Sequence, residues 1–413
     1  MFSVSQDFAP PFKLILPYFV VGSIFYVISM VLFFFLSVDG LALQDNALLA
    51  FTHIYLLGFV MMIIFGAMAQ LVPVVLEVGH FAVELFYAIW PLLLVGSLLM
   101  AFGFWLYPTL LPFGGTVVLV SFSIFIFEIF LTLKKVKELS LVMSSVLISN
   151  IFLLFGIAFG IVMALAYAGM IELDISRFLK AHVFSVVGGY IFITLMGLSV
   201  VLLPMFGLSH GFSQKPLKLS MSLMSISVSL VVLNSFVSFT PLEYVAYGVG
   251  FTSLIVYFNL VKTIFKTRAR KEIDIYAKSL IFAYISMLIA LAFGLIYLFS
   301  SYEPLVLAMS FLLFFSLFGF TITGHMYKIV PFLVWFDRFS PLVGKQKVPM
   351  LADMLPKKSS EAQLVFGVVG VVVITMAILL GSDALLMAGA SFLVVSSIAF
   401  LRSVIYMINF KGV

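Results

Sequence analysis

Five histidines are the residues of this chain best suited to bind a metal ion or a heme. They are His53, His80, His182, His210 and His325, and the chain contains no cysteine. Without thiolates, the chain cannot form disulfides, thiolate-ligated zinc sites or iron–sulfur clusters of its own. Metal or heme binding would therefore depend on histidine, methionine and carboxylate side chains.

A repeated Gly-x6-Pro pattern divides the chain into three similar parts. The copies begin at Gly66, Gly197 and Gly324, so successive copies are 131 and 127 residues apart. Each copy ends in Leu or Ile, an aliphatic residue and proline. A glycine and a proline at this spacing lie two turns apart on one helix face, where glycine permits close helix approach and proline bends or ends the helix. We interpret the pattern as one unit repeated three times, although glycine and proline are also simply common in membrane helices.

The composition is that of a membrane protein. Hydrophobic residues make up 64% of the chain and charged residues 9%, whereas soluble domains contain about a quarter charged residues. A helix that crosses a bilayer needs about 20 apolar residues. The apolar runs predict twelve transmembrane helices, at 14–36, 48–75, 81–104, 110–133, 141–169, 180–205, 217–238, 242–264, 276–300, 303–333, 362–381 and 384–409.

We therefore expect an all-α, polytopic membrane protein that forms a single membrane domain over residues 1–413. Its repeats would cover about 1–137, 138–272 and 273–413, with four helices in each. The second helix of each repeat would pack around a central pseudo-threefold axis. The longest connection is expected at 334–363, where the chain either lies along the membrane surface or forms a solvated loop.

The basic residues predict an orientation in the membrane. Arg177 and Lys180 alone fall in connections on one side, and the other Lys and Arg residues fall on the opposite side. Because basic connections stay in the cytoplasm, we expect both termini to be cytoplasmic in a multi-pass protein of the cell inner membrane. The +5 formal charge then reflects topology, so the lipid bilayer is the expected partner and nucleic acid is not.

The helix pattern resembles that of subunit I of the heme-copper oxidases. Segments 52–59, 181–206 and 328–335 are similar to those of uncharacterised bacterial relatives of that subunit, a group that also resembles the NnrS proteins. The resemblance implies a membrane protein that binds heme or copper. By the same resemblance, His53 takes the position of the low-spin heme ligand and His182 that of a copper ligand.

The ligand set of the family is incomplete in this chain. Oxygen and nitric oxide reductases of that superfamily use six histidines, and this chain has five. The adjacent His-His pair of the seventh helix and the His-x-His of the tenth are absent. A complete heme-copper centre is therefore excluded, and we do not expect an oxygen-reducing enzyme. If the chain is an enzyme, we expect a membrane oxidoreductase.

Two groups of candidate ligands follow. His53 and His182 are candidates for heme or metal ligation, and Met309 is a possible partner because it precedes its repeat's glycine by the same fifteen residues as His182. These side chains could instead hydrogen-bond and pack within the bundle. His80, His210 and His325 lie six or seven residues from the repeat prolines. They could share one divalent metal or carry protons, or they could be ordinary interfacial histidines.

Three functions remain open at this point. The first is a heme- or metal-binding protein for electron transfer or sensing. The second is a transporter or channel for a small molecule, for a metal ion such as copper, or for heme. The third is an assembly subunit that binds other subunits of a respiratory complex. The chain lacks phosphate-loop, dinucleotide-binding, zinc-protease and hydrolase motifs, so transport driven by its own ATP hydrolysis is unsupported.

Overall fold

The structure is a computed structural model that describes residues 6–38, 41 and 45–412. Helices account for 83% of it, and no strand occurs among the described residues. Twelve of the described helices are long and apolar enough to cross a membrane, which confirms the predicted number. They are Phe12–Phe35, Asn46–Leu76, Val83–Trp105, Pro108–Leu133, Leu141–Tyr167, Ile175–Gly207, Lys215–Val237, Thr240–Lys266, Ile275–Ser300, Pro304–Arg338, Lys357–Leu380 and Asp383–Ile408.

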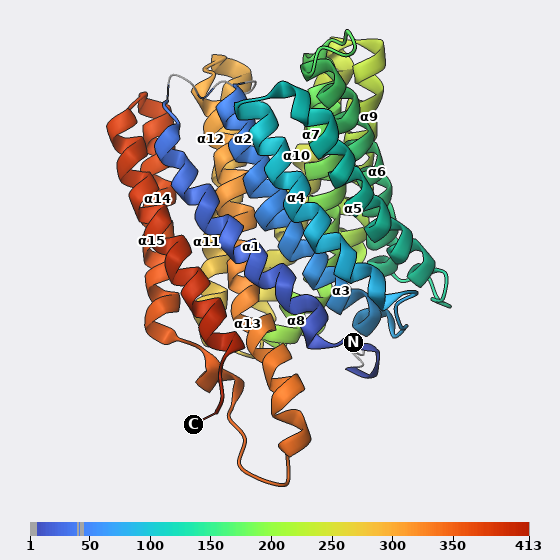
Figure 1. Ribbon diagram of the computed structural model, residues 1–413, viewed down its shortest axis with the longest axis vertical. Coiled ribbons are helices and arrows are strands. Elements are labelled where there is room, and N and C mark those ends of the chain that lie inside the picture. The colour runs from blue at the N-terminus through green and yellow to red at the C-terminus, as the bar shows by residue number, and fades with distance from the viewer. Residues whose placement is uncertain (1–5, 39–40, 42–44, 413) are drawn as a thin grey trace. The chain divides into compact units, whose positions relative to one another are not determined.

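Nine of these spans consist mainly of one α-helix, and three contain an additional π-helical segment. Figure 1 labels the α-helices. The single helices are α1 (Phe12–Leu32), α4 (Phe86–Trp105), α5 (Leu111–Leu133), α6 (Leu141–Tyr167), α9 (Lys215–Val237), α10 (Thr240–Lys266), α11 (Ile275–Ser300), α14 (Lys357–Leu380) and α15 (Asp383–Ile408). The interrupted spans are α2 (Asn46–His53), η3 (Ile54–Met61) and α3 (Met62–Leu76); α7 (Ile175–Val183), η6 (Phe184–Phe192) and α8 (Ile193–Gly207); and α12 (Pro304–Phe311), η7 (Leu312–Phe318) and α13 (Gly319–Arg338).

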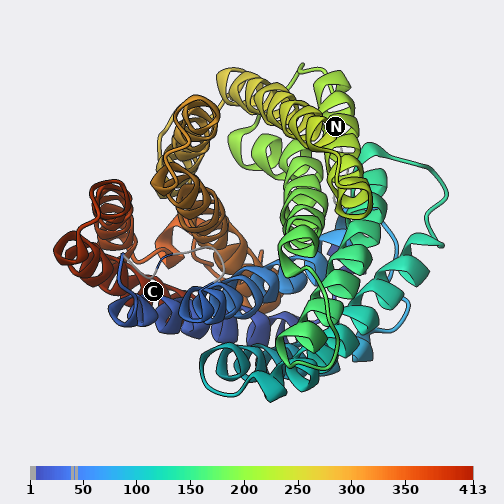
Figure 2. The ribbon, with the colours of Figure 1, turned by 90° about the horizontal axis from the view of Figure 1, so that it is seen from above.

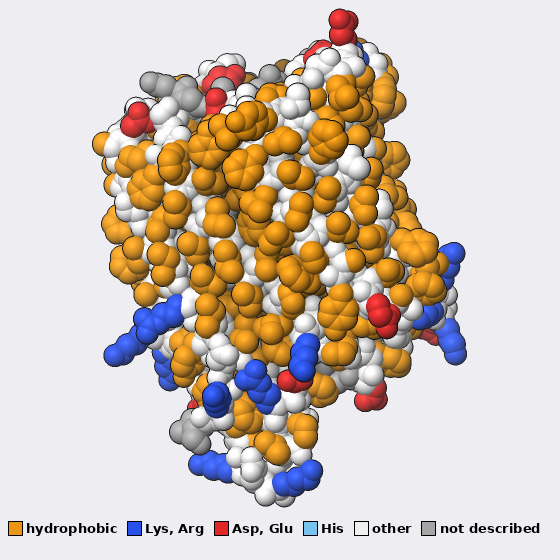
Figure 3. Space-filling view, viewed as in Figure 1, with side chains coloured by type: hydrophobic (Ala, Val, Ile, Leu, Met, Phe, Trp, Pro, Cys, Tyr) orange, Lys and Arg blue, Asp and Glu red, His pale blue; other side chains and the backbone are white. Residues whose placement is uncertain are grey.

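The outer surfaces of the helices are hydrophobic. Phe113, Phe236 and Phe299 are 66%, 62% and 91% exposed, and hydrophobic side chains cover most of the visible surface in Figure 3. Water would disfavour so much exposed apolar area, whereas lipid tails accommodate it. The surface therefore matches the environment that the composition predicts.

The helices pack into two compact units. Ala69–Leu99 and Tyr107–Glu272 form most of the first, where α9 packs along α10 and α6 packs against η6. The second consists of Pro11–Met68, Met100–Leu106 and Ile273–Val413. In this unit α14 lies beside α15, as the end-on view in Figure 2 shows, and α1 packs against α15 and η3.

The three π-helical segments occupy matching places in the second, sixth and tenth spans. Each ends five or six residues before a glycine of the repeated pattern, at Gly66, Gly197 or Gly324. Another glycine stands eight residues before the pattern glycine in two of the copies, at Gly58 and Gly189, and Ser316 takes its place in the third. All three lie inside their π-helical segments. A π-helix is rare and usually only one turn long, so three in corresponding positions form a distinctive local feature.

The pattern glycines permit close contact with the preceding long helix. A Cβ added to each glycine would come within van der Waals overlap of a Cβ on α1, α6 or α11. The separations would be 2.6 Å for Gly66 and Tyr18, 2.4 Å for Gly197 and Ser145, and 3.0 Å for Gly324 and Ser279. The glycines thus serve the role in helix packing that their spacing predicted.

Two of the pattern prolines lie in helices that end in the same way. Glu77 and Leu208, each four residues after its proline, have left-handed φ angles of 52° and 53°. The next backbone N–H donates to the carbonyl of Pro73 or Pro204, at 3.1 Å in both cases. This bond satisfies a terminal carbonyl, as in other helix ends with a left-handed residue.

The third interrupted span behaves differently at its proline. Helix α13 continues past Pro331 to Arg338, and α14 begins at Lys357, directly after Pro356. The connection between them therefore covers 339–356 and is shorter than the predicted loop at 334–363. Proline is tolerated as the residue before a helix, which explains the start of α14.

Candidate functional site

His182 lies on α7 against two glycines of α6. Its Nδ1–H donates to the carbonyl of Gly156 at 2.7 Å. A Cβ added to Gly160 would lie 3.1 Å from Cε1 and 3.3 Å from Nδ1 of His182. The Gly156 carbonyl and the missing side chain of Gly160, one turn further on, therefore form a place where the imidazole fits against the α6 backbone. A Cβ on Gly156 would instead meet Val186. We call these three residues the His182 seat.

The His182 seat fixes which ring nitrogen carries the proton. A backbone carbonyl only accepts hydrogen bonds, so the proton must be on Nδ1. In the neutral imidazole, Nε2 is then the basic nitrogen. Nε2 of His182 makes no hydrogen bond to any residue that the structure describes. Histidine ligands of metals and hemes are commonly held in this way, by donation from one nitrogen to a carbonyl.

His53 has the same proton position. It is the last residue of α2, it is half-buried, and its Nδ1–H donates to the carbonyl of Leu49 at 2.8 Å. Its ring lies 4.7 Å from the ring of Phe104, measured between centroids. The neutral form of His53 therefore also has its basic nitrogen at Nε2.

Both histidines stand directly before a π-helical segment. Segment η3 begins at Ile54, next to His53, and η6 begins at Phe184, two residues after His182. Inserted π-helical turns are frequent at functional sites because they rotate the following side chains relative to the rest of the helix. No feature of the sequence indicated these segments.

Met309 occupies the corresponding region of the tenth span, in α12. Its Sδ lies 3.0 Å from the place of a Cβ on Gly294, so the thioether packs on α11. Met309 and His53 belong to the second unit, and His182 belongs to the first. Joint ligation of one cofactor by these three residues stays a prediction.

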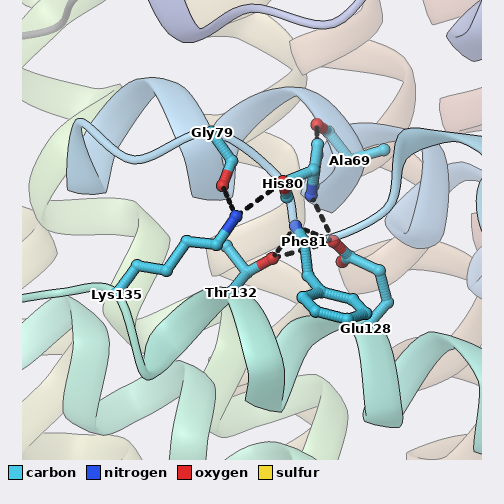
Figure 4. A network of polar contacts seen from close by, with 7 residues as sticks. All are labelled: Ala69, Gly79, His80, Phe81, Glu128, Thr132 and Lys135. Atoms are coloured by element: carbon cyan, nitrogen blue, oxygen red, sulfur yellow. Dashed lines mark hydrogen bonds and ion pairs between the residues drawn. The ribbon is translucent and has the colours of Figure 1, made fainter.

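His80 is buried and uses both ring nitrogens (Figure 4). Nε2–H donates to the carbonyl of Ala69 at 2.7 Å, and Nδ1 lies 2.9 Å from Oε1 of Glu128. Pro73 has no N–H, so it cannot supply the usual helical donor to the carbonyl four residues earlier, which is that of Ala69. His80 supplies the missing donor. Because both nitrogens are occupied, we do not identify His80 as a metal ligand.

One carboxylate oxygen of Glu128 accepts several hydrogen bonds. Besides His80, the backbone N–H of Phe81 at 3.0 Å and the Thr132 hydroxyl at 2.8 Å both donate to Oε1. The ammonium of Lys135 donates to the backbone carbonyls of Gly79 and His80, at 3.1 and 2.9 Å. We call the seven residues drawn in Figure 4 the His80 network: Ala69, Gly79, His80, Phe81, Glu128, Thr132 and Lys135. It attaches the connection after α3 to the end of α5.

The other two histidines of this candidate group, His210 and His325, have different surroundings. His210 is exposed, in the connection after α8. His325 lies on α13, where Nδ1–H donates to the carbonyl of Thr321 at 2.7 Å and the Tyr276 hydroxyl is 3.4 Å from Nε2. The described residues contain no group of three or more His, Asp or Glu side chains that could hold a metal ion. A metal site shared by His80, His210 and His325 stays a prediction.

Sequence reasoning missed the pairing of His80 with Glu128 and the glycines beside His182. One signal for the first was present: a proline inside a helix leaves a carbonyl that needs a donor, and His80 follows Pro73 closely. A signal for the second was the pair Gly156 and Gly160 at a one-turn spacing, which creates a groove on a helix. Neither signal indicates which side chain fills the position.

Comparison of the chain with protein-family models and with curated proteins finds no match.

Proposed function

We propose that this protein is a heme-binding integral membrane protein for electron transfer or sensing, with the architecture of heme-copper oxidase subunit I and without a complete oxygen-reducing centre. The His182 seat carries the proposal. It holds the imidazole in one orientation, with Nδ1–H on the Gly156 carbonyl and Nε2 as the basic nitrogen. His53 is the second candidate ligand because it has the same proton position.

The architecture that we propose has three four-helix repeats. Support comes from the matching π-helical segments, from the three glycine contacts with the preceding helix, and from the equal helix ends after Pro73 and Pro204. The basic connections support cytoplasmic termini, and hence a place in the cell inner membrane.

The chain's own residues would bind and orient the cofactor. Gly160 leaves room for the ring of His182, and the Gly156 carbonyl increases the basicity of Nε2 by accepting the Nδ1 proton. Hydrophobic helices around both histidines would exclude water, which affects the redox potential of a heme. When bound, a heme would supply a reversible one-electron couple.

The histidine inventory supports a reduced cofactor set. Of five histidines, His80 has both nitrogens engaged and His210 is exposed. His53, His182 and His325 remain, which is half of the six that a full heme-copper centre of the family requires. Three histidines are too few for both the heme and the copper sites of the family. We therefore propose a heme alone, with His182 as its ligand although the resemblance implies a copper ligand at this position.

The test is the absorption spectrum of the purified protein, oxidised and reduced, with iron and copper analysis of the same sample. Expression would be supplemented with a heme precursor. We expect a Soret band, reduced-state bands of a heme protein, and iron without equivalent copper. A protein that contains neither heme nor iron after such loading would contradict the proposal and leave transport or assembly as the alternatives.

A further inference from the structure

Glu128 has one carboxylate oxygen with several donors and one with none. Oε1 receives the hydrogen bonds of the His80 network, whereas Oε2 is buried and has no hydrogen-bond partner among the described residues. The Glu128 side chain is 0% exposed and that of His80 is 1% exposed. A buried anionic oxygen without a donor is unfavourable, so Oε2 requires a donor that is not a side chain of the network.

The bonds at Oε1 indicate the resting charge state of the pair. Three donors at one oxygen suit a carboxylate, because the hydroxyl oxygen of a carboxylic acid is a poor acceptor. His80 must keep a proton on Nε2 for the Ala69 carbonyl, so Nδ1 donates to Oε1 only when the ring is an imidazolium. The contacts thus favour an imidazolium paired with a carboxylate.

We propose that Oε2 of Glu128 is a proton-binding site. A proton added at Oε2 would neutralise the carboxylate and break none of the three hydrogen bonds at Oε1. The network could therefore take up and release a proton while the connection after α3 stays attached to α5. This proposal concerns proton exchange alone and does not depend on heme binding.

An exposed charged residue lies next to the site. Lys135 is exposed, and its ammonium reaches the His80 carbonyl at 2.9 Å. The other charged groups on the adjoining connections are Glu77 and Glu84, before and after His80, and Lys134, Lys137 and Glu138 after α5. Helices α3, α4 and α6 contain no Asp, Glu, Lys or Arg. Lys135 therefore marks the side of the network from which a proton would reach Glu128.

Infrared spectroscopy of the full-length protein in an ester-free detergent tests the site. A protonated carboxyl has a C=O stretching band that a carboxylate lacks and that moves to lower frequency in D2O. The other Asp and Glu side chains also protonate in acid, so the spectrum of the Glu128→Gln protein is subtracted from that of the unmodified protein at each pH. We expect the difference spectrum to contain such a band and the band to grow as the pH falls.

Two controls keep the result interpretable. Glu243 has donors at both carboxylate oxygens. Lys180, at 2.5 Å, and the Tyr247 hydroxyl donate to Oε1, and Asn234 donates to Oε2 at 3.5 Å. Glu243→Gln should therefore leave the Glu128 band unchanged. Labelling of glutamate with ¹³C in the unmodified protein should shift the band even if Glu128→Gln does not fold. If the difference spectrum between the unmodified protein and Glu128→Gln contains no pH-dependent carboxyl band, Oε2 does not bind a proton and the proposal is wrong.

Discussion

The His182 seat and the His80 network show two ways in which the first unit holds a histidine. In the seat, one ring nitrogen is bonded to a carbonyl and the other has no hydrogen-bond partner among the described residues. In the network, both nitrogens are bonded, one of them to a carboxylate. The number of hydrogen bonds that each ring makes therefore says more about its role than the burial of the ring does. The seat suits a ligand to a cofactor, whereas the network suits helix attachment and proton exchange.

Replacement of His80 should have the largest effect on stability. His80→Ala leaves the Glu128 carboxylate buried without its cation and the Ala69 carbonyl without a donor. We expect the free energy of unfolding to fall by about 3–5 kcal/mol. His182→Ala removes one hydrogen bond and should cost about 1 kcal/mol. Titration with a denaturing detergent measures both values.

The double variant His80→Ala/Glu128→Gln sharpens this result. It removes the unpaired carboxylate, so it should recover part of the stability that His80→Ala loses. Equal losses for His80→Ala and His182→Ala would contradict the distinction between the two regions.

Gly160→Ala should disturb the seat by an intermediate amount. The added Cβ would lie 3.1 Å from Cε1 of His182, so the imidazole or α6 must shift. We expect a loss of about 1–3 kcal/mol and a lower heme content. Gly248 on α10 is the matched control, because a Cβ there would meet open space. If Gly248→Ala and Gly160→Ala behave alike, the glycine does not form a specific place for His182.

Thr132→Val tests one bond of the His80 network. The hydroxyl donates to Glu128 and also accepts from the N–H of Phe81 at 2.9 Å. Its loss should cost about 1 kcal/mol, since Phe81 N–H keeps its bond to Glu128. Heme content should not change. A changed Soret band in Thr132→Val would show that the two regions are coupled.

Lowering the pH should have the smallest effect on stability, and the effect should be confined to the start of α7. The hydroxyl of Ser176 donates to Asp174 at 2.6 Å and lowers the pKa of this exposed carboxyl below its ordinary value. Because the folded-state pKa is the lower one, the carboxylate's stabilising contribution is present above about pH 4 and is lost as the pH falls further.

Hydrogen exchange of the α7 amides measures this effect. Protection should decrease as the pH falls below about 4, after correction for intrinsic exchange rates. Ser176→Ala should reduce that dependence. A pH dependence equal in the variant and the parent would argue against the Asp174 contact.

The sequence was sufficient to predict the twelve helices, because bilayer thickness alone requires long apolar runs. It also predicted that the pattern glycines allow close helix contact. The His80 network was not predictable, since its two main residues are 48 positions apart and meet through a fold of the connection after α3. The π-helical segments were missed because their composition is that of any apolar helix.

The optical spectrum of His182→Gly, recorded with and without added imidazole, tests the central claim most directly. Removal of the ring leaves space beside Gly156 and Gly160 that free imidazole can fill. We expect the Soret band of the unmodified protein to be lost or shifted in His182→Gly and to be restored by imidazole, with His210→Gly unchanged throughout. A heme spectrum identical in His182→Gly and the unmodified protein would show that His182 is not a ligand.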